Sequence, residues 1–133
     1  MASSHQTLSQ LAQSGPPSAE SSAQGVVEIV APSLDSMLSF YHSLGFTIER
    51  QTGPFAVVIG FGVRLFLAEN TAAPTCPRWV NLRIVVSDVD LIWGFVQELG
   101  LPVVSAISDR FYGLRDFIVA DPAGFEIRFA QVL

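Results

Sequence analysis

Hydrophobic residues along the first half of the chain alternate with polar ones in some stretches and recur at helical spacing in another. Four stretches have strand-like patterns, namely residues 26–31, 46–51, 55–60 and 63–69. Between the first two, residues 34–44 place apolar side chains on one face of a helix, with Ser33 as N-cap and Gly45 after the last turn. The pattern therefore predicts a strand, a helix and three further strands.

The second half repeats this order. A strand is predicted over residues 78–86 and a helix over 89–99 with Asp88 as its cap, followed by strands at 101–106, 114–120 and 125–132. Ile29 matches Ile84 at an offset of 55 residues, whereas Gly62 matches Gly124 at an offset of 62, so the second copy holds seven extra residues. The insertion is expected near residues 108–113, where a loop is a good place to find function.

These patterns define the predicted boundaries. One domain over residues 26–132 contains modules 26–69 and 78–132, joined by a linker over 70–77. Residues 1–25 are rich in Ser, Gln, Ala, Gly and Pro and are predicted to form a flexible tail. The alternative is a short helix over residues 4–13, capped by Ser4, with Leu8 and Leu11 packed on a neighbour.

Composition narrows the class of protein. The 133 residues carry a net charge of −5 and no lysine, which argues against nucleic acid as a partner. No apolar run is long enough for a bilayer, no secretory signal is visible, and the single Cys76 fits a reducing compartment. We therefore expect a soluble, cytoplasmic protein with no membrane partner.

The duplicated unit carries three recognisable motifs: Phe40–Tyr41 in the first helix, Leu44–Phe46 after it, and Asp121–Gly124 (Asp-Pro-Ala-Gly) before the last strand. In this combination the sequence resembles the vicinal oxygen chelate superfamily, which includes glyoxalase I, extradiol dioxygenases and the bleomycin resistance proteins. The resemblance covers roughly residues 26–132. It implies an α+β fold in which two βαβββ modules form curved mixed sheets around a central cleft.

The resemblance also implies where a metal would bind. The superfamily's four ligand positions fall on Val26, Phe66, Asn81 and Arg128. Valine and phenylalanine offer no donor, arginine repels a cation and asparagine is a weak ligand, so we predict no metal and no cofactor. The histidines, His5 in the tail and His42 on the outer part of a helix, do not change this. Shifting the alignment by two residues would bring in Glu28 and Glu126, which make a poor site without histidine.

Strand alternation predicts which side chains face the cleft. Together with aromatic residues of the inserted loop, the candidate ligand-binding residues are Glu28, Arg64, Phe66, Trp79, Asn81, Arg83, Phe111, Tyr112, Glu126 and Arg128. In one interpretation the arginines and glutamates neutralise one another. In the other, Arg128 stays available to bind a carboxylate, phosphate or carbonyl with its planar fork. Asp109 and Asp116 are candidate acids near the mouth of the cleft, but by default they are expected to be solvated loop or turn residues.

The favoured function is a metal-free protein that binds a small molecule, either an antibiotic or an aromatic or anionic metabolite, as the resemblance to the bleomycin resistance branch implies. The segment Tyr112–Phe117 followed by Asp121–Gly124 looks like the second module of that branch. No catalytic residue is predicted, because a Ser/His/Asp set cannot form with one histidine in the domain. A homodimer is expected. Two alternatives stay open: a lyase or isomerase with an unusual metal site or none, and a dimerising domain without a small ligand.

Overall fold

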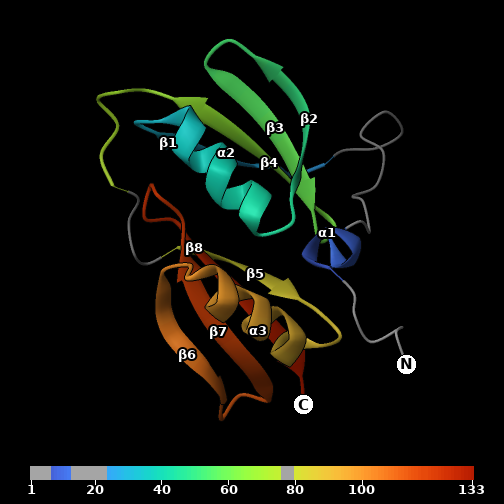
Figure 1. Ribbon diagram of the computed structural model, residues 1–133. Helices are drawn as coiled ribbons and strands as arrows, with labels where there is room; N and C mark the ends of the chain where they lie inside the picture. The colour runs from blue at the N-terminus through green and yellow to red at the C-terminus, as the bar shows by residue number, and fades with distance from the viewer. Residues whose placement is uncertain (1–6, 13–23, 76–79) are drawn as a thin grey trace. The chain divides into compact units, whose positions relative to one another are not determined.

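Figure 1 shows the computed structural model, which describes residues 7–12, 24–75 and 80–133. The chain divides into two compact units, Met1–Pro74 and Thr75–Leu133, and the division falls inside the predicted linker. Each unit contains a four-stranded mixed sheet and one long helix. The predicted α+β class with two βαβββ modules is therefore confirmed. Within the described residues, no helix is both long enough and apolar enough to cross a membrane.

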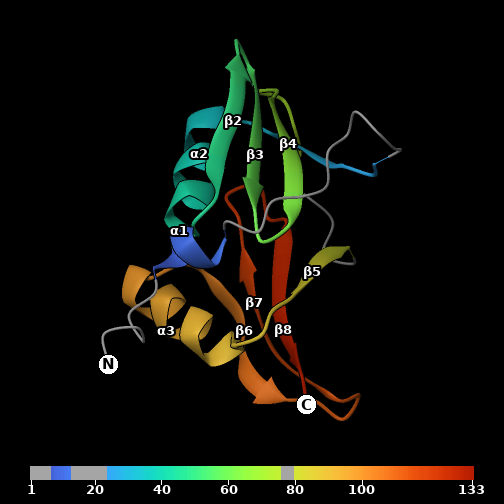
Figure 2. The same cartoon turned by 90° about the vertical axis from the view of Figure 1, so that its right-hand side faces the viewer.

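The first unit follows the predicted order closely. Its elements are β1 (Val27–Ala31), α2 (Leu34–Ser43), β2 (Thr47–Thr52), β3 (Phe55–Gly60) and β4 (Val63–Glu69). The sheet order is β1-β4-β3-β2, with β1 parallel to β4 and the other neighbours antiparallel. Helix α2 covers one face of this sheet (Figure 2). Met37 and Tyr41 of α2 and Leu65 and Leu67 of β4 are fully buried there.

The second unit repeats this topology. It contains β5 (Asn81–Val85), α3 (Val89–Leu99), β6 (Val103–Asp109), β7 (Leu114–Ala120) and β8 (Glu126–Val132), in the sheet order β5-β8-β7-β6. Strand β5 again runs parallel to the last strand of its module. Strand β6 extends three residues beyond its predicted end at Ala106 and reaches Asp109. The extra residues of this module are spread over several places: β6 and β7 are each one residue longer than β2 and β3, the turn at 110–113 is two residues longer than that at 53–54, and the segment 121–125 is three residues longer than 61–62.

The predicted helix caps and turns determine where these helices and strands begin. Ser33 accepts a hydrogen bond from the backbone N–H of Ser36, and Asp88 accepts one from that of Leu91, so both predicted N-caps are confirmed. The Asp121 carboxylate accepts hydrogen bonds from the backbone N–H groups of Ala123 and Phe125, each at 2.9 Å. This turn sets the point at which β8 begins.

Part of the N-terminal segment forms a short helix, α1 (Leu8–Leu11). Its cap is Thr7 rather than Ser4, which lies outside the described residues. Leu8 is buried against Gly45, where an added Cβ atom would lie only 2.8 Å from the Leu8 carbonyl oxygen. Gly45 also has a φ of +101°, so both the backbone and the close approach require glycine here.

Candidate functional site

Polar side chains gather on the face of the second sheet that lies opposite α3. Arg83 of β5 is in register with Arg128 of β8, and Asp116 of β7 is in register with Ala130 of β8. Because side chains alternate along a strand, Arg83, Asp116 and Arg128 point to the same face. On the other face, the Phe117 ring contacts Trp93 of α3 with ring centroids 5.1 Å apart.

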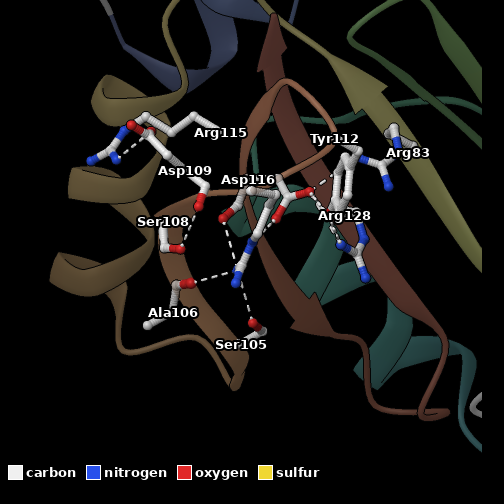
Figure 3. A network of polar contacts seen from close by, with 10 residues as sticks. Arg83, Ser105, Ala106, Ser108, Asp109, Tyr112, Arg115, Asp116 and Arg128 are labelled. Carbon is white, nitrogen blue, oxygen red and sulfur yellow. Dashed lines mark hydrogen bonds and ion pairs between the residues drawn. The ribbon is translucent and has the colours of Figure 1, made fainter. Parts of the chain in front are cut away.

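Asp116 is the centre of this group, and its side chain is fully buried. Its Oδ2 atom accepts hydrogen bonds from Nη1 of Arg83 at 3.0 Å, Nη1 of Arg128 at 3.1 Å and the Tyr112 hydroxyl at 2.8 Å. Its Oδ1 atom accepts one from Nε of Arg110 at 2.7 Å. Figure 3 shows these contacts. We call Arg83, Arg110 and Arg128, arranged around Asp116, the arginine cluster.

The turn at 110–113 supplies two members of the site. Nη2 of Arg110 donates to Ser105 Oγ at 3.0 Å and to the backbone oxygen of Ala106 at 2.9 Å, which fixes the guanidinium over β6. The Tyr112 hydroxyl accepts a hydrogen bond from Nη1 of Arg128 at 3.0 Å, and the Arg83 guanidinium lies 5.5 Å from the centre of its ring. The cluster is therefore held by contacts from all four strands of the sheet and from the turn at 110–113.

The charges in this cluster do not balance. Three guanidiniums contact a single carboxylate, which leaves a formal excess of two positive charges. The arginine side chains are 34%, 25% and 19% exposed for Arg83, Arg110 and Arg128. The Nε atom of Arg128 is buried and has no hydrogen-bond partner, alone among buried side-chain nitrogen and oxygen atoms of the described residues. The site is thus positively charged and has an unused donor.

The electrostatics of Asp116 predict how acid affects the fold. Burial raises the pKa of Asp116, but hydrogen bonds from Arg110, Tyr112, Arg128 and Arg83 outweigh it and lower the pKa from 3.8 to about 2. Because the folded-state pKa is depressed, this contribution of roughly 2 kcal/mol is present above pH 3.8 and is lost as the pH falls towards 2. Urea unfolding at a series of pH values should show this loss. In Asp116→Asn the slope in this pH range should become shallower; an unchanged slope would contradict the assignment.

The predicted site residues of the first module form a different arrangement. Glu28 and Phe66 are in register on β1 and β4, and strand alternation places Arg64 on their face, away from α2. Arg64 donates to both carboxylate oxygens of Glu49, at 2.8 and 3.0 Å, and to Gln24 at 2.8 Å. Its guanidinium is therefore already paired, whereas Glu28 is exposed.

Of the two interpretations of the arginines, the one in which they pair with Glu28 and Glu126 is wrong. Arg83 and Arg128 pair with Asp116, and Arg64 pairs with Glu49. The register explains this, because the buried β7 strand brings Asp116 within reach of both arginines.

The remaining predicted residues have separate positions. Asn81 is exposed on β5, and Phe111 is fully exposed at the turn, with its ring edge-to-face on Tyr112 at 5.1 Å. Phe66 packs in the same way on Phe55 at 5.2 Å. Trp79 lies outside the described residues.

Sequence reasoning missed Arg110 and did not identify Asp116 as the acceptor of the arginines. Asp116 was expected to be solvated, but it is buried within β7. The sequence did contain a signal for Asp116. Side chains alternate along the predicted strand 114–120, so Asp116 points away from the face of Phe117 and Val119 and towards the face of the arginines. Arg110 had no such signal, since it lies in the part of the second module that has no counterpart in the first.

The residues at the positions implied for a metal do not suit one. Arg128 occupies one of them, forms an ion pair with Asp116 and has Arg83 beside it on the sheet. Among the residues that the structure describes, no group of three or more His, Cys, Asp or Glu side chains is arranged to hold a metal ion. His42 is exposed on α2. This donor set instead favours an anion.

Two tandem βαβββ modules with mixed sheets define a class of protein built by duplication of a single unit. The model of the Glyoxalase/Bleomycin resistance protein/Dioxygenase superfamily matches residues 23–129, and the chain belongs to this superfamily. The resemblance noted from the sequence is thereby confirmed.

Solved structures show the same fold. A glyoxalase/bleomycin resistance protein/dioxygenase from Alicyclobacillus acidocaldarius is 22% identical, with a TM-score of 0.70 over 82% of this chain and 90% of that one. The bleomycin resistance determinant encoded on transposon Tn5 is 18% identical, with a TM-score of 0.72 over 84% and 98%. A bleomycin-binding protein complexed with bleomycin is 17% identical, with a TM-score of 0.69 over 84% and 100%. Comparison with curated proteins finds no match.

Proposed function

We propose that this protein binds a small molecule without a metal and that the arginine cluster receives an anionic group of that molecule. The observation that carries the proposal is the sharing of one buried carboxylate, Asp116, by three arginines. A carboxylate or phosphate would offset the remaining positive charge. Arginine is suited to this task because its planar fork matches the geometry of both groups.

The cluster has the properties of a preorganised binding site. Asp116 and the contacts of Arg110 hold the guanidiniums in place before a ligand arrives, which lowers the entropy lost on binding. The arginine side chains are largely buried, so the effective dielectric constant is lower than in water and an ion pair is stronger. Tyr112 is 43% exposed and Phe111 fully exposed, so both offer flat surfaces to an aromatic ligand.

The similar structures support the binding of a small molecule, but they do not identify which one. Two of them are a bleomycin resistance determinant and a bleomycin-binding protein in complex with bleomycin, which supports binding of a small molecule by this fold. In the present chain the arginine cluster favours an anionic antibiotic or aromatic metabolite over a cationic one. We further propose that the protein acts as a homodimer in the cytoplasm.

Calorimetric titration tests this function with ring compounds that differ only in charge. Phenyl phosphate and benzoate are expected to bind, and their affinity should fall as salt is added because the attraction is electrostatic. Benzamide and benzylamine have similar size and should bind more weakly or not at all. Tighter binding of benzylamine, or no binding of either anion at millimolar concentration, would show that the cluster is not an anion site.

A further inference from the structure

The sheet face that carries the arginine cluster continues at one end into exposed apolar residues. On β8, the residues that follow Arg128 on this face are Ala130 and Val132, because side chains alternate along a strand. On β5, Val85 is in register with Ala130 and follows Arg83 by two residues, so it also points to this face. Val85 is 59% exposed and Val132 is 64% exposed. Two exposed valines therefore lie beyond the arginines on neighbouring strands.

The turn at 110–113 adds two aromatic side chains at the same end. Tyr112 reaches Asp116 with its hydroxyl, and the fully exposed ring of Phe111 packs edge-to-face on the Tyr112 ring at 5.1 Å. The turn is held beside the end of β8, because the backbone N–H of Leu133 donates to the carbonyl oxygen of Gly113 at 3.0 Å. Exposed apolar side chains gathered in one place commonly mark a binding surface. We call Val85, Phe111, Tyr112 and Val132 the apolar strip.

The opposite end of the same face has a different character. In that direction the residues beyond the arginines are Glu126 of β8 and Asn81 of β5, which are in register. A carboxylate and a carboxamide are poorly suited to receive an apolar group. A ligand whose anionic group lies on the arginine cluster therefore gains most when its remaining atoms extend towards the apolar strip.

We propose that the ligand is an amphiphilic anion, with its carboxylate or phosphate on the arginine cluster and an apolar body over the apolar strip. This inference rests on the proposed function, because the strip alone does not select an anion. The excess positive charge of the cluster selects the anionic group, and burial of the exposed valines and rings selects the apolar body.

The geometry of β8 favours an extended body over a compact one. Val132 is four residues beyond Arg128, which places it about 13 Å further along the strand. An alkyl or alkyl-aryl chain lying along β8 would contact both Val85 and Val132, whereas a single ring next to the cluster would leave Val132 exposed.

Straight-chain carboxylates from acetate to octanoate test this inference by calorimetric titration. The affinity should rise about threefold for every two methylene groups added, which is less than full burial would give because one side of the chain stays in water. Octylamine, a cation with a chain of the same length, should bind more weakly than octanoate. This comparison excludes general adhesion to apolar surface.

A pair of variants locates the chain on the protein. Val132→Thr keeps the shape of the side chain but adds a hydroxyl, so the gain in affinity from acetate to octanoate should fall by about half. Leu99→Gln is the matched control, because it removes an exposed apolar side chain from the end of α3, which covers the other face of the sheet. It should keep the full gain.

The outcomes separate this inference from the proposed function. If neither phenyl phosphate nor any of these carboxylates binds, the arginine cluster is not an anion site and the proposed function fails. If phenyl phosphate binds but a longer chain brings no gain, the anion site stands and the role of the apolar strip is overturned. An unchanged gain in Val132→Thr would overturn it as well. So would a dimer that Val132→Thr converts to a monomer in sedimentation without loss of octanoate affinity, since a second copy would then cover the strip.

Discussion

Asp116→Asn is expected to lower the free energy of unfolding by about 3 kcal/mol, the largest effect of any substitution at the site. Asparagine has the same shape but no charge, so the guanidiniums of Arg83, Arg110 and Arg128 would repel one another without compensation. Its amide NH₂ would also point a donor at groups that only donate. Urea unfolding of the two proteins at neutral pH measures the difference.

The matched control is Asp109→Asn. Asp109 also contacts an arginine, with Oδ1 3.0 Å from Nη1 of Arg115, but its side chain is 62% exposed. Exposed ion pairs contribute little, so this variant should lose less than about 1 kcal/mol. If Asp109→Asn proves as destabilising as Asp116→Asn, the buried carboxylate is not what holds the arginine cluster together.

Arg128→Gln is expected to weaken the binding of phenyl phosphate by about tenfold to a hundredfold. The expected loss is that of one or two hydrogen bonds between charged groups, about 1.5 to 3 kcal/mol. The fold should tolerate the change, because Asp116 keeps its hydrogen bonds from Arg83, Arg110 and Tyr112. Calorimetric titration of the variant and the parent gives the ratio of dissociation constants.

Arg115→Gln separates this local effect from the general loss of a positive charge. Arg115 lies on the same strand as Asp116 but on the opposite face, where it pairs with Asp90 at 2.9 Å and with Asp109 at 3.0 Å. Its removal should change the affinity for phenyl phosphate less than about twofold, because salt screens the attraction between an anion at the cluster and a distant charge. Equal losses in both variants would mean that Arg128 attracts the anion only from afar.

The fold could be predicted from the sequence because its determinants are local. Ser33 and Asp88 cap their helices, and the Asp121 turn starts the last strand, as the residue types alone indicate. The repeat gave a second, independent indication of each element. Gly62 and Gly124, for example, precede the last strand of their respective modules. Element ends were less predictable: β6 continues to Asp109 because pairing with β7 extends it.

The site was only partly predictable because it depends on which strands pair and in what register. Arg83, Arg128 and Tyr112 were expected to face a ligand, and the structure brings these three together. Their acceptor was not identified, since Asp116 reaches them only through the register of β7 on β8. Side-chain parity places both Asp116 and Glu126 on the face of the arginines, and only the register shows which of them the arginines contact.

The most direct test of the anion site is the ¹⁵N–¹H NMR spectrum of the seven arginine Nε–H groups during titration with phenyl phosphate. Substitution of each arginine assigns the signals. The Nε–H of Arg128, which has no acceptor among the described residues, should shift most, and that of Arg64, already bound to Glu49, should hardly move. If phenyl phosphate binds while the Arg128 signal stays in place, the arginine cluster is not where the protein binds its ligand.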